Sequence, residues 1–374
     1  MSKTAGLYIH IPFCRTRCGY CNFYSVTNPD YIPNYLKCLF KEMGAYRRKF
    51  SRFDTVYIGG GTPSLLDIRQ LQDIIEKIQE NFILLSGAEI TIEINPADMD
   101  ISALKTLKDM GVNRLNIGIQ SLDPKILTFL ERRHTTAQAV SAIETSRGAG
   151  FDNLGLDLIY GVPGQNMKSW MDTLTQVLSF RPEHLSCYQL TIEPETPLGK
   201  RHQKGDIFLP GEKLGYDFFM KTAETLEDAG YTHYEVSSFA KNTTFFSRHN
   251  RKYWEHTPYL GLGPTAHSFI DNRRWWNHRS LERYITDIEA GRSPVEETES
   301  LTMEQLRLEA IHLGLCTKKG IHLKDFAREY DYDLIAEKGE ILKKLEEEGL
   351  IAIQNGYLYP TRAGLAVADS LSLI

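Results

Sequence analysis

The stretch Tyr8-Ile-His-Ile-Pro-Phe-Cys-Arg-Thr-Arg-Cys-Gly-Tyr-Cys-Asn-Phe23 contains three cysteines, and no fourth cysteine follows closely. Cys14, Cys18 and Cys21 have the spacing Cys-x3-Cys-x2-Cys. Three thiolates can hold three irons of a [4Fe–4S] cluster and leave the fourth iron open. Because an open iron can bind and activate a further ligand, the motif predicts a metal centre with a chemical role and these three cysteines as its ligands.

Simpler explanations of the three cysteines fit less well. A structural zinc site uses four ligands, commonly two Cys-x2-Cys pairs, and this stretch has only one such pair. His10 is a conceivable fourth ligand, but it lies between two isoleucines in an expected strand. Disulfides are not expected, because a long chain with six scattered cysteines and no secretory signal indicates a reducing compartment. The isolated Cys38, Cys187 and Cys316 are expected to be buried.

Length and composition indicate an ordinary globular protein. The chain has 374 residues, 42% hydrophobic and 24% charged, which suits one large domain and a smaller one. The net charge of −5 gives no general attraction to nucleic acid or anionic lipid. The first residues lack the apolar core of a signal peptide, and no apolar run is long enough to span a bilayer. We therefore expect a cytoplasmic protein, for which peripheral membrane contact is conceivable.

Short β-branched or aromatic runs alternate with longer helical patterns through the first 230 residues or so. The expected strands are residues 7–11, 55–58, 89–94, 114–119, 153–159 and 184–192. The expected helices are residues 31–48, 67–82, 101–110, 137–149, 167–179 and 211–229. Six β–α units in order predict an α/β fold with a parallel sheet, here a partial (β/α)6 barrel. The functional residues of such a barrel lie at the carboxyl ends of its strands.

The remainder divides into two parts of different character. We expect residues 1–235 to form the barrel, and residues 236–300, rich in aromatic, His and Asn residues, to form a connecting region of loops and short elements. Residues 301–374 are expected to form a C-terminal winged-helix-like α+β domain. Nine basic and twelve acidic residues there argue against nucleic-acid binding, which needs neutralised phosphates. A packing or partner-docking role is expected instead.

The winged-helix prediction depends on the order of elements after residue 300. Helical patterns cover residues 303–315 and 333–348. A β-hairpin is expected over residues 349–359, with its turn at Asn355-Gly356, and a final helix follows from Thr361.

A glycine-rich turn, Gly59-Gly60-Gly61-Thr62-Pro63, follows the second expected strand, while the cysteine motif follows the first. In this combination the chain resembles the radical S-adenosylmethionine (radical SAM) superfamily. Over essentially its whole length it resembles the branch that contains the oxygen-independent coproporphyrinogen III oxidase and the HemW-type haem chaperones. The resemblance implies a [4Fe–4S] cluster whose open iron is chelated by SAM, an electron donor to the cluster, and cleavage of SAM to a 5′-deoxyadenosyl radical.

The resemblance also implies a set of SAM contacts. They are Tyr8 and Tyr20 beside the cysteines, Gly60, Gly61 and Thr62 in the glycine-rich turn, and Glu93, Gln120, Arg132 and Asp157 at or after later strands. These residue types suit the role, since glycine admits close backbone approach, arginine can hold a carboxylate bidentately, and a buried carboxylate needs a partner. An internal salt bridge is the alternative for each charged member. Arg133 is an alternative to Arg132, but the spacing from Gln120 favours Arg132.

Three features indicate which member of the branch this chain is similar to. The oxidases carry another cysteine two positions after the third, where this chain has Phe23, and they have a longer extension than the thirteen residues before Cys14. The run His249-Asn-Arg-Lys-Tyr-Trp254 matches the His-Asn-x-x-Tyr-Trp motif of the HemW-type chaperones. The resemblance implies His249 as a haem ligand and Tyr253 and Trp254 as packing partners of the macrocycle.

Alternatives to this haem site stay open at this point. His249 could cap a loop and Trp254 could fill core space. His10, His256 and His267 are other candidate haem ligands.

The leading hypothesis is therefore a haem chaperone that binds haem, a [4Fe–4S] cluster and SAM, delivers haem to respiratory haem proteins, and lacks coproporphyrinogen oxidase activity. No catalytic residue is assigned. The alternatives are radical decarboxylation of coproporphyrinogen III propionates, or another radical reaction on a tetrapyrrole such as methyl transfer to haem. The sequence does not name the recipient proteins. It leaves open whether haem is attached covalently, whether SAM is cleaved in function and whether the protein forms a homodimer.

Overall fold

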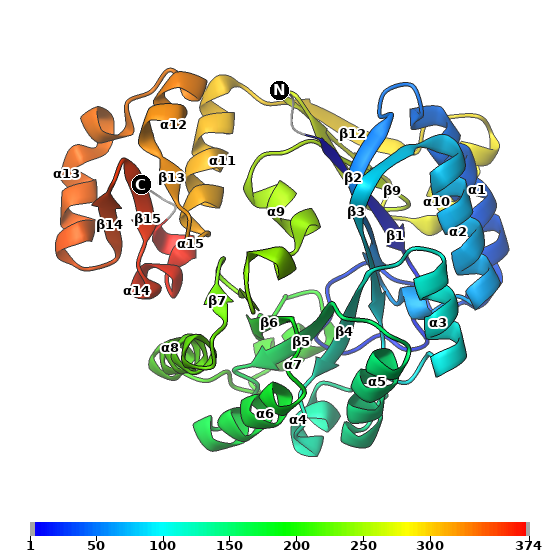
Figure 1. The fold of residues 1–374 in the computed structure, drawn as a ribbon, viewed down its shortest axis with the longest axis horizontal. Coiled ribbons are helices and arrows are strands. Elements are labelled where there is room, and N and C mark those ends of the chain that lie inside the picture. Colours follow the sequence, from blue (N-terminus) through cyan, green and yellow to red (C-terminus); the bar gives the residue numbers. More distant parts are fainter. Residues whose placement is uncertain (1–3, 372–374) are drawn as a thin grey trace.

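The computed structural model describes residues 4–371 and has a large sheet with helices packed around it and a separate C-terminal module (Figure 1). Six parallel strands form the centre of the sheet: β1 (Ala5–Ile11), β2 (Arg52–Gly60), β3 (Ile83–Ile94), β4 (Arg114–Gln120), β5 (Leu154–Tyr160) and β6 (His184–Gln189). They are neighbours in chain order, each parallel to the next. The predicted α/β fold with a partial barrel is therefore confirmed.

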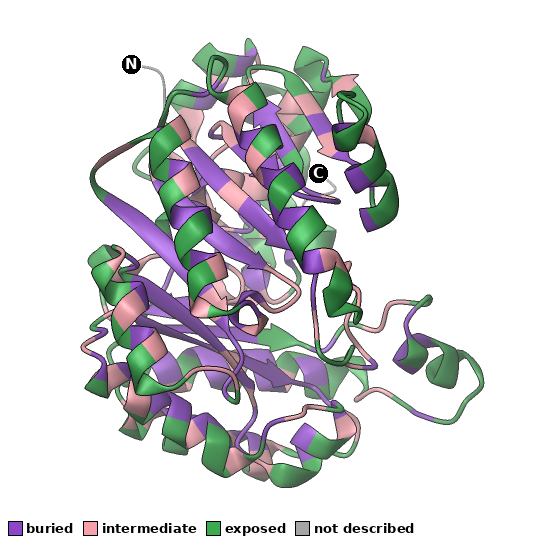
Figure 2. Ribbon diagram, turned by 90° about the vertical axis from the view of Figure 1, so that its right-hand side faces the viewer, coloured by how far each residue is buried: buried purple, intermediate pink, exposed green. Residues whose placement is uncertain are grey.

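Helices follow the strands and cover the outer face of the sheet. They are α1 (Ile32–Tyr46), α2 (Ile68–Asn81), α3 (Ile101–Asp109), α4 (Pro124–Phe129), α5 (Thr136–Gly148), α6 (Met167–Ser179), α7 (Pro197–Gln203) and α8 (Glu212–Asp228). Their buried faces turn toward the sheet and their exposed faces toward solvent (Figure 2). α4 and α7 were not predicted, because helices of six and seven residues are too short to show a clear helical period.

Helix α2 shows how the local sequence produces this packing. Its buried residues, Leu71, Ile74, Ile75 and Ile78, recur at helical spacing and form one apolar face. Asp67 accepts a hydrogen bond from the backbone of Gln70, whose side chain in turn accepts one from the Asp67 amide. This capping box fixes where the helix begins.

The region after residue 230 extends the sheet on both edges. β7 (Thr232–His233) and β8 (Ser238–Ala240) pair beyond β6, while β9 (Tyr259–Leu262), β10 (His267–Ile270), β11 (Arg273–Asn277) and β12 (Val295–Ser300) extend the sheet from β1. The sequence predicted loops and short elements here, whereas β9 runs parallel to β1 and belongs to the main sheet. Strands of four to six residues with aromatic and charged side chains lack the apolar alternation that marks a strand. The helices of this region are α9 (Arg248–Trp254) and α10 (Leu281–Glu289).

The C-terminal module has its own core and a small sheet. It contains α11 (Met303–Leu315), β13 (Ile321–His322), α12 (Leu323–Tyr330), α13 (Leu334–Glu347), β14 (Ile351–Gln354), β15 (Tyr357–Pro360), α14 (Arg362–Leu365) and α15 (Ala368–Leu371). The hairpin β14–β15 turns at Asn355 and Gly356, both with positive φ, as predicted. Backbone hydrogen bonds from Val236 to Cys316 and from Lys318 to Tyr234 join the module to the barrel. The division of the chain at residues 235 and 300 stays a prediction.

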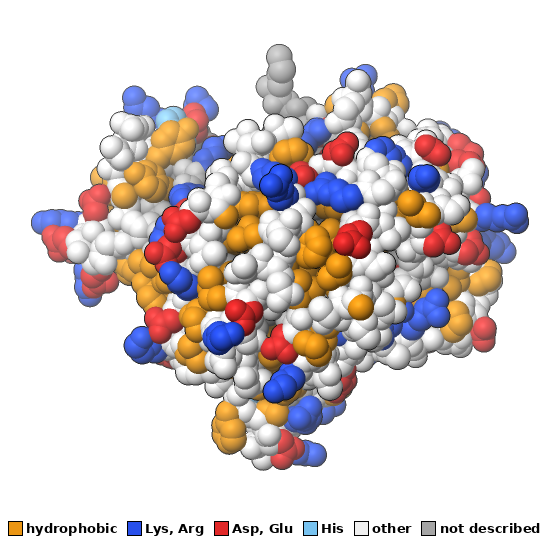
Figure 3. Space-filling view, turned by 60° about the horizontal axis from the view of Figure 1, so that its bottom comes forward, with side chains coloured by type: hydrophobic (Ala, Val, Ile, Leu, Met, Phe, Trp, Pro, Cys, Tyr) orange, Lys and Arg blue, Asp and Glu red, His pale blue; other side chains and the backbone are white. Residues whose placement is uncertain are grey.

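Two further observations concern the hydropathy of the helices and the charge distribution on the surface. Among residues 4–371, no helix is both long enough and apolar enough to cross a bilayer. On the face shown in Figure 3, basic and acidic side chains are interspersed, with apolar side chains between them.

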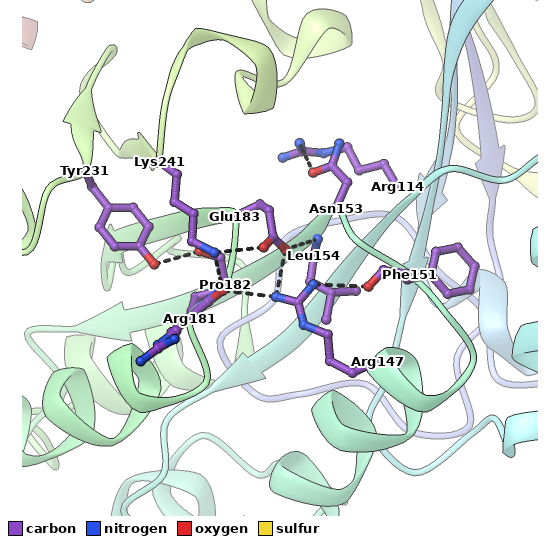
Figure 4. Close-up of polar contacts among 10 residues, drawn as sticks. All are labelled: Arg114, Arg147, Phe151, Asn153, Leu154, Arg181, Pro182, Glu183, Tyr231 and Lys241. Carbon is purple, nitrogen blue, oxygen red and sulfur yellow. Dashed lines mark hydrogen bonds and ion pairs between the residues drawn. The ribbon is translucent and has the colours of Figure 1, made fainter.

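A buried ion-pair network holds the amino ends of β5 and β6 together (Figure 4). Glu183 accepts hydrogen bonds from Lys241 at 2.8 Å and from the Leu154 amide at 3.1 Å, and it pairs with Arg147 at 2.7 Å. Burial alone would raise the pKa of Glu183, but these donors outweigh it and hold the pKa below its ordinary value. Because functional groups of such barrels lie at the opposite end of the strands, we interpret this network as structural.

Replacing Glu183 by glutamine is expected to lower the free energy of unfolding by about 3–5 kcal/mol at neutral pH, because two cations lose their buried partner. A depressed folded-state pKa contributes stability above the unfolded-state pKa, and this contribution is lost as the pH falls. The difference between wild type and Glu183→Gln should therefore shrink as the pH falls below the ordinary range of a glutamate pKa. Urea unfolding of both proteins at neutral and at acidic pH measures this difference in the free energy of unfolding. Asp172→Asn, which breaks an exposed pair with Lys168, is the control and should show no such difference.

Candidate functional site

The cysteine loop lies directly after β1, at the carboxyl end of the sheet. Cys14, Cys18 and Cys21 are all partly exposed, whereas the other three cysteines are buried, as predicted. The Cys14 amide donates to Val26 O at 3.0 Å, and the Cys21 amide donates to Cys18 O at 3.1 Å. The first bond ties the start of the loop to Val26, and the second forms a turn within the loop, while the three cysteines stay partly exposed.

Polar groups from other strands contact the thiols. Thr62 Oγ1 lies 3.4 Å from Cys14 Sγ, and Arg132 donates to Cys18 Sγ at 3.5 Å. Burial raises the pKa of Cys21, and the neighbouring charges of Cys18 and Cys14 add to the increase. Within the described part of the chain, no three His, Cys, Asp or Glu side chains are placed to hold a single metal ion. A cluster differs from a single ion in this respect, since each thiolate binds a different iron.

The glycine-rich turn after β2 packs too tightly for side chains. Gly60 has φ +111°, and a Cβ there would lie 2.6 Å from His10 Nδ1. A Cβ on Gly61 would lie 2.7 Å from the carbonyl oxygen of Phe13, in the cysteine loop. The turn therefore holds its backbone directly against the cysteine loop, as the close approach of a ligand to both would require.

Glu93 lies at the end of β3 beside this turn. Its carboxylate accepts hydrogen bonds from the Tyr57 hydroxyl at 2.7 Å and from the Gly60 amide at 3.2 Å. Burial raises its pKa to about 7, and these two donors only partly offset that effect. Glu93 is therefore poised to gain or lose a proton near neutral pH.

Asp157 and Arg132 each have a buried polar atom without a partner. Asp157 accepts a hydrogen bond from Asn116 at 2.6 Å on one oxygen, while its other oxygen, Oδ1, has none among the described residues. Burial raises the pKa of Asp157 to about 6. Arg132 donates to Gly118 O at 2.9 Å, but its Nε also lacks a partner. Such buried atoms indicate a missing partner, for which a ligand is one source.

Most of the predicted SAM contacts line one cavity of about 520 Å³. They are Tyr20, Gly60, Gly61, Thr62, Glu93, Gln120, Arg132 and Asp157, together with Cys21. Gln120 has φ +61° at the end of β4, a strained conformation of the kind that concentrates at functional sites. Tyr8 does not line the cavity, and its hydroxyl is hydrogen-bonded to His10 at 3.0 Å. Arg133 pairs with Asp98 instead of entering the cavity.

The cavity has further lining residues that the sequence did not single out. They include Tyr57, Arg114, Asn116, His184, Ser186 and Asn250. Asn116 and Ser186 could have been found from the register of the sheet. Ser186 pairs with Asp157, and Asn116 pairs with Gly155, two residues before Asp157 on the same strand. The cavity offers three carboxylates, two guanidiniums and the backbone of the glycine-rich turn beside the cysteine loop. This donor set fits a ligand that carries both cationic and carboxylate groups, as SAM does.

The motif His249–Trp254 forms most of α9. His249 is buried, with Nδ1 hydrogen-bonded to Thr55 at 2.9 Å and Nε2 to Tyr253 at 2.9 Å. Desolvation by burial lowers its pKa to about 3. His249 as a haem ligand stays a prediction, and it requires the Tyr253 hydrogen bond to break. In the present arrangement His249 anchors α9 to β2.

The other candidate haem ligands have different surroundings. His10 is buried, and both of its ring nitrogens are hydrogen-bonded, to Tyr8 and to Tyr24 O. His256 follows α9, and its Nε2 lies 3.1 Å from Glu309. His267 stacks on Trp276 at the sheet edge formed by β10 and β11.

Two family models match the two parts of the chain. The Radical SAM superfamily matches residues 8–177, and the HemN C-terminal domain matches residues 301–367. Together with the fold and the cysteine loop, these matches define a radical SAM protein, a class for which a [4Fe–4S] cluster and SAM are implied.

Relatives along the whole chain narrow this class. The protein is 35% identical to "Heme chaperone HemW" of Bacillus subtilis, with 97% of each chain covered. It is 30% identical to the protein of the same name from Lactococcus lactis, covering 99% of this chain and 97% of that one. It is 33% identical to mouse "Radical S-adenosyl methionine domain-containing protein 1, mitochondrial", covering 100% and 87%. The chain belongs to the HemW family.

A solved structure agrees with the fold. The coproporphyrinogen III oxidase HemN from Escherichia coli superposes with a TM-score of 0.86 at 23% identity, covering 100% of this chain and 90% of that one. At this identity the likeness shows the fold alone.

Proposed function

We propose that this protein is a haem chaperone that binds haem and delivers it to respiratory haem proteins. Support comes from its family, whose bacterial relatives carry the name haem chaperone. The position of Phe23 supports it further, because this residue stands where the oxidases carry another cysteine and its side chain is 68% exposed.

In this proposal the cofactors occupy the carboxyl end of the sheet. Cys14, Cys18 and Cys21 hold the [4Fe–4S] cluster, and Arg132 places a positive charge beside the Cys18 thiolate. The 520 Å³ cavity would hold SAM, with Glu93 and Asp157 available to its cationic groups and the Gly60–Gly61 backbone available to its methionine moiety. When bound and reduced, the cluster would supply an electron for the cleavage of SAM. The chain's own residues position SAM and shield it from water.

The observation that carries the proposal is the placement of α9. Asn250, near its start, lines the SAM cavity, while Arg251 and Trp254 line a second cavity on the side of the C-terminal module. The motif that marks the family thus forms a wall between the SAM cavity and a separate space. A protein that couples SAM to the binding of a second molecule needs such an element.

Haem titration of the anaerobically reconstituted protein tests the proposal. We expect a saturable Soret band in the wild type and about tenfold weaker binding in Trp254→Ala, because a stacking surface for the macrocycle is lost. Trp276→Ala, at the sheet edge, is the matched control and should bind normally. Absence of haem binding by the wild type would contradict the proposal. Unchanged binding in His249→Ala would remove that residue as a ligand.

Haem delivery and the alternative reactions on tetrapyrroles are tested by separate measurements. Transfer of bound haem to an apo respiratory haem protein, followed by difference spectroscopy, tests the delivery step. Formation of protoporphyrinogen IX under anaerobic turnover would favour the alternative function as a coproporphyrinogen III oxidase. Methylated haem among the products would indicate methyl transfer.

The affinity for SAM should depend on pH. Protons bind Asp157 and Glu93 as the pH falls through about 6 and about 7, and each protonation removes a negative charge that attracts the sulfonium and ammonium groups. We expect the Kd for SAM to rise by about tenfold or more between pH 7.5 and pH 5.5. Anaerobic calorimetry measures this change. Glu93→Gln should bind SAM more weakly at pH 7.5 and lose part of the pH dependence, and an unchanged profile would exclude Glu93 from the site.

A further inference from the structure

A second cavity, of about 640 Å³, lies between α9 and the C-terminal module. We call it the α9–α12 cleft, because α9 forms one wall and α12, with the preceding loop and the end of α11, forms the other. In Figure 1, α9 stands between the main sheet and the module that contains α11 and α12. The volume falls within the range of roughly 300–1,000 Å³ that is usual for small-molecule sites.

Aromatic side chains from both sides line the cleft. Phe246 and Trp254 belong to the α9 side, and Phe326 and Tyr330 belong to α12. Trp254 is only partly buried, as are Tyr253 and Glu255 on either side of it. Two aromatic walls suit a flat, largely apolar ligand, since rings stack on rings.

Cations at the cleft suit acidic substituents on such a ligand. Arg251 and Lys318 line the cleft and are already paired with Glu255 and Glu227. Lys319 lines it as well, is exposed, and forms no ion pair within residues 4–371. Its ammonium is therefore available to a carboxylate of a bound molecule.

Three histidines line the cleft. Nε2 of His233 lies 3.3 Å from Val236 O and Nε2 of His256 lies 3.1 Å from Glu309, whereas His322 has the arrangement typical of metal ligands. His322 Nδ1 lies 2.7 Å from Asp325 Oδ2, and both residues line the cleft. A carboxylate at Nδ1 keeps the proton there and leaves the lone pair of Nε2 for a metal. No hydrogen bond to Nε2 is found in the described part of the chain, and the side chain is 33% exposed.

The SAM cavity is a poorer place for the same ligand. The histidine in its lining, His184, is 1% exposed, and its Nε2 lies 2.7 Å from the Tyr234 hydroxyl. Tyr234 itself lines the α9–α12 cleft, and its hydroxyl accepts a hydrogen bond from the Ser247 amide before α9. The two cavities thus share a wall made of Tyr234 and α9, so a ligand in the cleft lies next to the SAM site without competing for its space.

We propose that haem lies in the α9–α12 cleft, stacked against Trp254, with a propionate near Lys319 and His322 Nε2 as axial ligand of the iron. This inference rests on the proposed haem-binding function and names its site. It makes the C-terminal module a part of the haem site.

Ferric haem titration of the full chain with absorbance readout tests the assignment. His322→Met is expected to keep a haem spectrum with a shifted Soret band, because thioether replaces imidazole on the iron. His322→Ala should bind at least about tenfold more weakly, and Lys319→Ala about fivefold more weakly. His312→Met on α11 and Lys344→Ala on α13 make matched changes in the same module outside the cleft, and both should behave as wild type.

The possible outcomes distinguish a wrong assignment of the haem site from a wrong proposal of haem binding. A haem spectrum in His322→Met identical to that of the wild type would overturn the assignment while leaving haem binding intact. No saturable spectrum in the wild type would instead remove the proposed function. Thermal melts and SAM binding of each variant show whether it is folded, and Lys319→Ala, at an exposed position, tests the cleft even if a His322 variant does not fold.

Discussion

Cys18→Ala is expected to abolish the iron–sulfur centre. After anaerobic reconstitution the variant should retain less than about a tenth of the wild-type iron and sulfide, because two thiolates cannot replace three around a cluster with one open iron. Cys18 is also the thiol to which Arg132 donates, so this substitution removes one partner of a partly buried cation. Iron and sulfide analysis, with the visible charge-transfer absorbance, measures the loss.

Cys316→Ala is the control for this prediction. Cys316 is buried at the end of α11, far along the chain from the cysteine loop, and its loss should leave the iron content unchanged. Wild-type iron in Cys18→Ala would exclude the triad as the ligand set. Equal losses in both variants would point to a general effect of cysteine removal.

Gly61→Ala is expected to disturb both the fold and the cofactor site. The new methyl group would lie 2.7 Å from Phe13 O and 2.9 Å from Ile11 O, which are backbone atoms that cannot rotate away. Overpacking of this kind lowers the free energy of unfolding by about 1–3 kcal/mol. Because the turn borders both the SAM cavity and the cysteine loop, we expect SAM affinity to fall by about a hundredfold. Urea unfolding and anaerobic calorimetry measure the two effects.

Gly339→Ala is the control, and it is expected to raise the free energy of unfolding instead of lowering it. Gly339 lies within α13, and a Cβ there would meet nothing within 4 Å. Alanine in a helix interior is about 1 kcal/mol more favourable than glycine, so this variant should be more stable and bind SAM normally. Normal SAM affinity in Gly61→Ala would show that the turn does not approach the ligand.

The sequence predicted several of the residues that line the candidate SAM cavity, because they follow strands. Parallel strands bring their carboxyl ends to one edge, so Cys21, Gly60, Glu93 and Gln120, each at or just after a different strand, meet there. Tyr8 was the exception: it lies within β1, and its side chain bonds to His10 instead of lining the cavity.

The strands after residue 230 were not predicted. β9 pairs with β1, more than 240 residues away, and such pairing compensates for the weak local pattern of a four-residue strand. Local propensity is a weak guide to strands, because neighbouring strands supply much of their stabilisation.

The sequence by itself predicted the cysteine triad as a metal centre, the six β–α units and the family motif, because each depends on residue type and short-range spacing. Only the tertiary structure decided what the motif residues contact. Thr55, 194 positions away, holds the His249 ring inside the barrel, while Trp254 on the same helix lines a cleft completed by α12. Burial and partners of a side chain arise from packing between distant segments, and no local pattern encodes them. For that reason the cysteine triad could be read from its spacing, whereas the α9–α12 cleft emerged only when the C-terminal module was placed against α9.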